Sequence, residues 1–485
     1  MTAETSKTPE SPKTTRRSDA GPPLAAPDRR RWRALAVLGL FQFVLVLDLT
    51  IVNVALPRIQ HDLGFSGPGL AWVVNGYALM AGGLLLLGGR LADIYGRRRL
   101  FLAGVAVFAL ASAVSGAAAG AGMLLTGRFA QGVGEALAAP AALGLIALLF
   151  TEPGERAKAL GIWGGLTGLG GIAGTIISGV LTDLASWRWI FFINLPVVLV
   201  VLALVPRLVT ESRMARDHRR LDLTGAVTAT VGLVAIVSGL QQAATHPWGS
   251  WQVLAPLLGG LALLAATVLV EARSVAPLIP PRLFADRTRV TANVLSLLNT
   301  AAFFTFVFLL TLYEQQVLGY SPLRGGLSYV PFGLAIGAGI AFGSALLPRA
   351  GVRALLVTSF AGLAAGLLMT LRLDADGSYV GGVLPCMLVV GLFTGVTFPA
   401  LLDAALHGVT GEDSSVASAV QNTMQQVGGA IGLACLATLA FRHTGPTPSG
   451  ATAVDGYHSA FQVAAAVLIV GATVALTLSR RKRTP

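Results

Sequence analysis

The chain has 485 residues, of which 54% are hydrophobic and only 12% are charged, and its formal net charge is +12. A soluble domain carries about 25% charged residues, so the composition excludes an ordinary soluble protein and predicts an all-α polytopic membrane protein. The positive charge does not indicate nucleic-acid binding, because the arginines gather at the ends of apolar runs with almost no aromatic residues among them.

Apolar runs long enough to cross a bilayer follow one another along the chain, and we count about fourteen of them. They lie near residues 34–56, 71–88, 100–120, 123–149, 159–182, 189–206, 223–242, 252–270, 291–312, 327–348, 353–371, 379–402, 418–441 and 457–478. Most Lys and Arg residues fall in segments that share one side of the membrane if both termini are cytoplasmic. This bias predicts an even number of spans with both ends inside the cell.

The segment from Gly343 to Arg353 follows the tenth run much as the segment from Gly89 to Arg97 follows the second. This faint repeat predicts two six-helix halves, at 34–206 and 291–478, joined by a linker at 207–290 that carries two inserted helices. We expect a disordered cytoplasmic tail at residues 1–33 and a basic cytoplasmic tail at 479–485.

Asp48 is a charged residue inside the first run, about 21 Å along a helix from Arg33 at about 1.5 Å per residue. A charge at this depth is costly unless it is paired or hydrated. Thr50 and Asn53 add polar groups nearby. We favour a protonatable or cation-attracting site formed by Asp48 with Asn53, and the alternative is an anchor that hydrogen-bonds neighbouring helices.

The loop between the second and third runs is short, basic and rich in glycine. It contains Gly89, Asp93, Gly96, Arg97 and Arg98. Gly89 would let two helices approach, and Gly96 would take a positive φ where the chain reverses. Asp93 is either a helix-end acid paired with an arginine or a conformational latch that binds in one state and releases in another.

Arg128, Gln131 and Glu135 are spaced so that they share one face of the fourth helix. Arg128 stays protonated, so its role would be to bias the proton affinity of a nearby carboxylate, and Asp48 at similar depth is one such partner. Burial favours the neutral form of a carboxyl group, which suits Glu135 to proton exchange. The alternative is that Glu135 only satisfies Arg128.

The fifth run is rich in glycine, which lets helices pack closely. Its central positions are Gly170, Gly174, Thr175 and Gly179. In the second half, Asn422, Gln425 and Gln426 either line a cavity or bond across helices. Glu314 and Arg324 are expected in a solvated outer loop. Cys386 and Cys435 lie in apolar runs, and no metal-ligand spacing is present, so we expect no metal and no cofactor.

The pattern G-x-x-x-D-x-x-G-R-R, from Gly89 to Arg98, resembles the loop between the second and third helices of the major facilitator superfamily. The residues around Asp48 and the R-x-x-Q-G-x-G string at Arg128 resemble motifs of its fourteen-span drug:proton antiporters. The stretch from Gly170 to Gly179 is similar to the antiporter motif G-x-x-x-G-P-x-x-G-G, although Thr175 replaces the proline and Ser178 a glycine.

The resemblance implies the major facilitator fold and a monomeric transporter, not an enzyme, in a bacterial cell membrane. Its expected partners are protons, lipid and a small-molecule substrate. The expected function is proton-coupled export of lipophilic or cationic drugs or antibiotics by alternating access. A metabolite exporter or proton-coupled uptake symporter on the same fold remains an alternative, because the antiporter motif is altered. A receptor or an enzyme is the rival from another class, and no nucleophile–base pattern supports it.

Overall fold

The computed structural model describes residues 29–211, 223–273, 283, 285–409, 414–444 and 450–478, and these residues form helices without a strand. Helices are expected because lipid offers no hydrogen-bond partner to a backbone N–H or C=O group. Of the two polar tails expected from the sequence, residues 1–28 and 479–485 lie outside the described residues. Residues from Arg29 onward already belong to the first helix.

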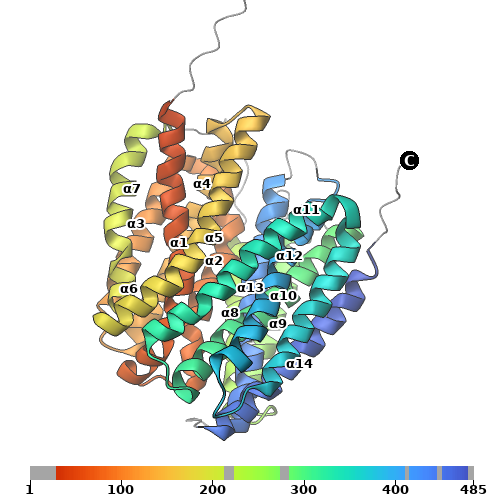
Figure 1. Cartoon of the computed structure of the whole chain (residues 1–485). Helices are drawn as coiled ribbons and strands as arrows, with labels where there is room; N and C mark the ends of the chain where they lie inside the picture. The colour runs from red at the N-terminus through yellow and green to blue at the C-terminus, as the bar shows by residue number, and fades with distance from the viewer. Residues whose placement is uncertain are drawn as a thin grey trace, which may run out of the picture.

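The N-terminal half is a bundle that Figure 1 colours from red to yellow. Its helices are α1 (Arg29–Leu63), α2 (Gly67–Tyr95), α3 (Arg97–Gly116), α4 (Ala121–Leu149), α5 (Pro153–Leu184), the short α6 (Trp189–Phe192) and α7 (Asn194–Leu208). Two helices follow, α8 (Leu223–Gln242) and α9 (Trp251–Arg273).

The C-terminal half is the second bundle, coloured green to blue in Figure 1. It consists of α10 (Arg287–Leu312), the π-helical segment η2 (Tyr313–Val317), α11 (Pro322–Met369), the 3₁₀ segment η3 (Thr370–Arg372), the π-helical segment η4 (Tyr379–Val383), α12 (Leu384–Ala405), α13 (Ser414–Thr444) and α14 (Ala451–Ala475).

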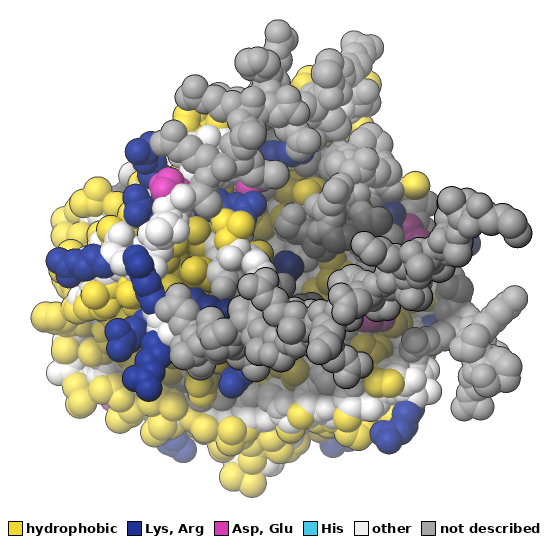
Figure 2. Space-filling model, turned by 90° about the horizontal axis from the view of Figure 1, so that it is seen from above, with side chains coloured by type: hydrophobic (Ala, Val, Ile, Leu, Met, Phe, Trp, Pro, Cys, Tyr) yellow, Lys and Arg dark blue, Asp and Glu magenta, His cyan; other side chains and the backbone are white. Residues whose placement is uncertain are grey.

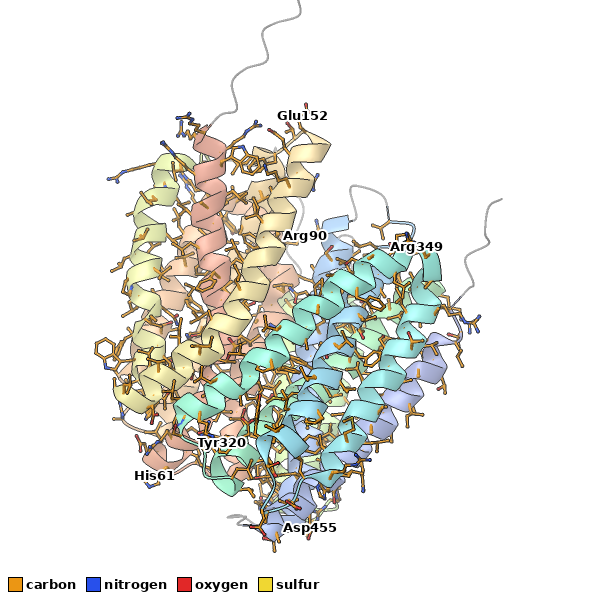
Figure 3. All side chains as sticks on the ribbon, in the orientation of Figure 1. His61, Arg90, Glu152, Tyr320, Arg349 and Asp455 are labelled. Atoms are coloured by element: carbon orange, nitrogen blue, oxygen red, sulfur yellow. The ribbon has the colours of Figure 1, made fainter. Side chains whose placement is uncertain are left out.

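Thirteen helices among the described residues are long and apolar enough to cross a membrane. One of them, Pro322–Arg372, has 51 residues, far more than the ~20 that one crossing needs. Gly351 interrupts it with φ 78° and ψ 160°, and the chain turns back near Arg349 (Figure 3). This helix therefore provides two crossings, so the thirteen helices accommodate the fourteen spans expected from the sequence.

The molecule has two ends, which we name after labelled residues. His61, Tyr320 and Asp455 lie at the Tyr320 end, and Arg90 and Arg349 lie at the Arg90 end (Figure 3). Figure 2 views the Arg90 end and shows many Lys and Arg side chains gathered on it. This is the end that the topology expected from the sequence assigns to the cytoplasm.

The two halves pack tightly at the Tyr320 end through α5 and α11 (Figure 1). A Cβ atom built on Gly179 would lie 2.7 Å from the carbonyl oxygen of Pro322, and one built on Gly326 would strike the carbonyl oxygen of Thr175. The largest buried apolar cluster also combines the halves here, because it joins Leu56 of α1 to Phe306 of α10. Glycine is required at this contact because the backbones touch.

The same pair of helices separates toward the Arg90 end. A Cβ built on Gly161, Gly164 or Gly165 of α5 would meet no described atom within 4 Å, and the same is true of Gly337 of α11. Phe342 of α11 is 59% exposed. The halves are therefore closed against each other at the Tyr320 end and apart at the Arg90 end.

Candidate functional site

Asp48 and Arg128 form an ion pair inside the N-terminal half. Asp48 comes from the middle of α1 and Arg128 from the first third of α4, and both side chains are buried, with 0% and 1% of their area exposed. Arg128 Nη1 donates to Asp48 Oδ2 over 2.6 Å. The partners lie 80 residues apart in sequence, so only the packing of α1 against α4 brings them together.

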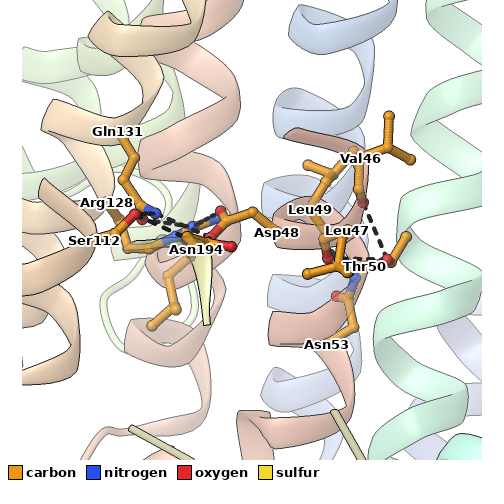
Figure 4. A network of polar contacts seen from close by, with 11 residues as sticks. Val46, Leu47, Asp48, Leu49, Thr50, Asn53, Ser112, Arg128, Gln131 and Asn194 are labelled. Carbon is orange, nitrogen blue, oxygen red and sulfur yellow. Dashed lines mark hydrogen bonds and ion pairs between the residues drawn. The ribbon is translucent and has the colours of Figure 1, made fainter. Parts of the chain in front are cut away.

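The second carboxylate oxygen of Asp48 accepts two further hydrogen bonds (Figure 4). Gln131 Nε2 donates to Oδ1 over 3.0 Å, and Asn194 Nδ2 donates to the same atom over 2.8 Å. Both amides also reach Ser112 Oγ, at 2.8 and 3.4 Å. Every group that contacts the Asp48 carboxyl is a donor, and this arrangement matches the ionised carboxylate.

Arg128 is held in place by groups other than Asp48. Its Nε donates to the carbonyl oxygen of Val73 over 2.8 Å, and Nη1 also donates to Gln131 Oε1 over 2.8 Å. Its Cζ atom lies 4.5 Å from the centre of the Tyr77 ring. A buried pair with this many partners is stable, but removal of one partner typically costs about 3–5 kcal/mol, because the other charge is left uncompensated.

Of the predicted residues, the structure joins Asp48, Arg128 and Gln131 directly. Glu135 lies one turn beyond Gln131 on α4, and its Oε2 has no hydrogen-bond partner among the described residues. Asn53 lies apart from this network, because its Nδ2 donates over 3.1 Å to the Leu49 carbonyl oxygen on its own helix (Figure 4).

Ser112 of α3 and Asn194 of α7 complete the network and were not singled out from the sequence. Both are fully or almost fully buried. Asn194 follows the aromatic string Trp187–Phe192, and Ser112 stands in a run of small apolar residues. A polar side chain in an otherwise apolar span was the available signal, but the sequence does not show which spans share an interior.

Helix α5 contacts the network helix α1 on one side and the other half of the molecule on the other. A Cβ on Gly170 would lie 3.0 Å from the Phe43 carbonyl oxygen, and a Cβ on Gly174 would lie 2.9 Å from that of Leu47. Ser178 Oγ donates to the carbonyl oxygen of Ile51. Thr175 and Gly179 face α11 instead. The helix is continuous over Pro153–Leu184, so it connects the contact with α1 to the contact between the halves.

The basic loop is fixed within the N-terminal half in this conformation. Arg97 pairs with Asp93 at 2.9 Å and donates over 3.0 Å to the carbonyl oxygen of Gly144. Gly96 has φ 106°, as the expected chain reversal requires. The close helix approach expected at Gly89 occurs one residue earlier. A Cβ on Gly88 would strike the backbone of α4, whereas a Cβ on Gly89 would lie 3.7 Å from Cβ of Pro140, an ordinary contact distance.

A carboxylate that the sequence did not point to caps the helix after this loop. Glu211 accepts hydrogen bonds of 3.1 Å from the backbone N–H groups of Arg98 and Arg99. An acid at a helix N-terminus is favourable because unpaired N–H groups and the helix dipole both attract negative charge. Glu211 thereby ties the start of α3 to the segment after α7.

The polar residues of α13 lie near its contact with α2 of the other half. Asn422 is exposed and Gln425 is half-buried. A Cβ on Gly82 of α2 would lie 2.6 Å from the Gln426 side chain, and Thr423 Oγ1 donates to the Gly82 carbonyl oxygen over 3.1 Å. Gln426 therefore packs between the halves, whereas the Asn422 side chain is exposed.

The expectation that Glu314 lies in a solvated outer loop is wrong. Its side chain is completely buried, because helix α10 continues beyond the predicted end of its apolar run through the π-helical segment η2. Arg324, the other residue of that expectation, is exposed and lies over the Tyr320 ring at 3.9 Å.

Comparison with known proteins identifies the family. Residues 38–433 match the model of the Major Facilitator Superfamily. The chain is 41% identical to the puromycin resistance protein pur8 of Streptomyces alboniger, over 93% of this chain and 92% of that protein. It is 40% identical to the cephamycin export protein CmcT of Amycolatopsis lactamdurans, over 86% of each chain.

A third relative and a solved structure agree with this assignment. The lincomycin resistance protein of Streptomyces lincolnensis is 36% identical over 95% of this chain and 94% of its own. A crystal structure of the peptide transporter POT in complex with sulfate superposes with a TM-score of 0.68 at 16% identity, covering 92% of this chain and 94% of the other. At this identity the superposition shows the shared fold alone.

Proposed function

The chain belongs to the major facilitator superfamily, a class of membrane transporters, and we propose that it exports lipophilic or cationic antibiotics in exchange for protons. The observation that carries the proposal is the buried group of Asp48, Arg128, Gln131 and Asn194. The printed functions of the relatives, resistance to puromycin and lincomycin and export of cephamycin, support antibiotics as the substrate class.

We place the Arg90 end in the cytoplasm and both termini with it. The support is the gathering of Lys and Arg side chains at that end (Figure 2) and the general bias of such residues toward cytoplasmic loops. In this orientation the structure is open toward the cytoplasm and closed toward the outside. An exporter takes up its substrate in this state, and Asn422, Gln425 and Gln426 are placed to meet it.

Asp48 is the principal coupling acid in this scheme, and Glu135 is the second. In the cytoplasm-facing state Asp48 is surrounded by donors and carries a negative charge. When the site turns outward, a proton from the outside neutralises Asp48 or Glu135, and the attraction that holds α1 against Arg128 of α4 weakens. Release of this proton to the cytoplasm restores the pair, so one cycle moves a proton inward and a substrate outward.

The movement of α1 reaches the contact between the halves through α5. Gly170 and Gly174 keep α5 in backbone contact with Phe43 and Leu47 of α1, just before Asp48, while Gly179 contacts Pro322 at the start of α11. A change in the position of α1 therefore alters the closure of the Tyr320 end. This is the physical link between proton binding and alternating access.

The loop of Gly89, Asp93, Gly96, Arg97 and Arg98 serves as the cytoplasmic latch. With the halves apart at the Arg90 end, Asp93 is paired with Arg97 inside its own half. When this end closes, the carboxylate becomes available to the facing helices of the C-terminal half. We expect the transporter to work as a monomer.

Transport by purified protein in liposomes tests the proposal. With the vesicle interior acidic, a lipophilic cationic dye should accumulate inside, and a protonophore should abolish the accumulation. The Asp48→Asn variant, reconstituted in equal amount, is the matched control and should not accumulate dye.

Two outcomes would contradict drug:proton antiport. Accumulation that survives the protonophore would remove the proton from the mechanism. Accumulation only when the gradient is reversed, so that dye and protons move in the same direction, would favour the symporter alternative that Thr175 and Ser178 leave open in the altered antiporter motif.

A further inference from the structure

Glu314 is a buried acid that the proposed coupling network does not use. It lies in η2 at the Tyr320 end of the C-terminal half, and none of its side-chain surface is exposed. Among the described residues it takes part in no salt bridge, and its Oε1 has no hydrogen-bond partner. A buried ionised carboxylate with so few partners is energetically costly. The contacts of Glu314 therefore have to be examined for the form, ionised or protonated, that they stabilise.

The hydrogen bonds of Ser328 indicate which form of Glu314 is present. Ser328 Oγ lies 2.8 Å from Glu314 Oε2 and 2.6 Å from the carbonyl oxygen of Gly325. A hydroxyl group has one hydrogen to donate, so Ser328 cannot make a full hydrogen bond to both oxygens as the donor. Both contacts are satisfied together when Ser328 donates to Gly325 and a protonated Glu314 donates to Ser328 Oγ.

The residues around this pair are held in position and offer no compensating cation in contact. Tyr379 donates to the carbonyl oxygen of Ser328 over 2.8 Å, and the Tyr329 hydroxyl is engaged with Thr311 and with the Val307 carbonyl oxygen. Five ionisable side chains are close enough to interact electrostatically with Glu314. They are Tyr313, Tyr329, Tyr379, Cys386 and the cation Arg324. Arg324 is exposed and lies over Tyr320, so it compensates Glu314 only from a distance.

The position of Glu314 ties its proton to the closure of the Tyr320 end. The next two residues reach across to α1: Gln315 Nε2 donates to the Val54 carbonyl oxygen over 2.7 Å, and Gln316 Nε2 donates to Gln60 Oε1 over 2.8 Å. Ser328 follows closely on Gly326, which touches Thr175 of α5. Glu314 thus joins two segments that both carry contacts between the halves.

We propose that Glu314 is a second proton-binding site, in the C-terminal half, whose protonated form holds the Tyr320 end closed. In the closed state the carboxyl O–H donates to Ser328 Oγ and aligns η2 with α11. When this end opens, water reaches Glu314, the proton passes to that water, and the ionised carboxylate becomes hydrated. A π-helical segment is a frequent feature of functional sites, because its wider turn places side chains where an α-helix does not.

The inference rests on the proposed proton-coupled export, but its test needs no transport. We would place spin labels at His61→Cys and Asp376→Cys, which are exposed on opposite halves at the Tyr320 end, in a chain carrying Cys435→Ala. The distance between the labels is then measured over a range of pH. In the otherwise unchanged chain we expect the short, closed distance at low pH and a growing longer population as pH rises.

The Glu314→Gln variant keeps a neutral side chain at every pH, so we expect the closed distance throughout. Glu152→Gln, the same substitution at an exposed position, is the matched control and should keep the pH response. An identical response in Glu314→Gln and in the parent would overturn the proposal.

Infrared spectra provide an independent readout in case the labels disturb the end. The difference between parent and Glu314→Gln at neutral pH should show the loss of a protonated carboxyl band, whereas loss of a carboxylate band would contradict the proposal. If the spectroscopic results agree with the proposal but the protein does not transport the dye, the export function would be contradicted and the Glu314 site would still be supported.

Discussion

Among the described residues of this transporter, Asp48 in α1 of one half and Glu314 in η2 of the other are each completely buried, and their surroundings are opposite. Asp48 faces an arginine and two amide donors. Among the described residues Glu314 has one hydrogen-bond partner, Ser328, whose hydroxyl group also contacts the carbonyl oxygen of Gly325. The difference teaches that burial alone does not set the ionisation of an acid, because the donors within reach decide which form is stabilised.

The largest expected effect comes from removing the charge of the first acid. Asp48→Asn leaves Arg128 buried without its counter-ion, at a typical cost of about 3–5 kcal/mol, and removes the proton acceptor. We expect proton-driven accumulation of drug in vesicles to fall to background, while the protein still inserts into the membrane. Full transport by this variant would break the comparison, since Asp48 would then be only a structural anchor.

A smaller loss is expected from crowding the contact that links the two acids. Gly326→Ala places a methyl group against the carbonyl oxygen of Thr175, so the Tyr320 end closes less well and transport slows. Gly337→Ala, on the same helix, meets no described atom within 4 Å and serves as the control. The initial rate of drug uptake by Gly337→Ala should equal that of the parent, and the rate of Gly326→Ala should be lower than both. Equal rates for all three would show that this contact does not limit the transport cycle.

A modest effect is expected at the partner of the second acid. Ser328→Ala removes the acceptor of the Glu314 proton and should cost about 1 kcal/mol, the usual value of one hydrogen bond. Thermal unfolding in detergent should show a small decrease in midpoint, and the label distances should open at lower pH than in the parent, because the protonated form loses its partner. A variant that opens at higher pH would reverse the assigned direction of the hydrogen bond.

The smallest effect is expected at Asn53, which the sequence grouped with Asp48. Among the described residues its side chain bonds to the Leu49 carbonyl oxygen of its own helix and to no other group, so Asn53→Ala should leave the rate and pH dependence of uptake close to those of the parent. Comparing Asn53→Ala with Asp48→Asn shows whether transport requires the coupling network or only a polar side chain in α1. A loss as large as that of Asp48→Asn would return Asn53 to the site.

Much of this arrangement could be predicted from the sequence because it depends on spacing along single helices. Arg128 and Gln131 share a face at i and i+3, and Asp48 stands at a similar depth, so their meeting was foreseeable. Ser112 and Asn194 were not, because nothing in one sequence tells which of several spans approach the same interior.

Hydropathy does not predict the burial of Glu314. The apolar run ends near residue 312, followed by Tyr313, two glutamines and a Gly-Tyr-Ser-Pro turn, a pattern typical of a loop at the membrane surface. The structure instead continues the helix by one π-helical turn and covers it with α11 and η4. Hydropathy measures the preference of a segment for lipid and carries no information on what other segments will cover it.

The most direct test of the central claim, exchange of a drug for a proton through the Asp48 network, follows proton movement itself. Vesicles with an acidic interior and an entrapped pH indicator are given puromycin or a cationic dye from outside. We predict that the interior becomes more alkaline on addition with the parent protein and with Asn53→Ala, but not with Asp48→Asn. Drug entry without any change in internal pH, or the same alkalinisation with Asp48→Asn, would contradict the account.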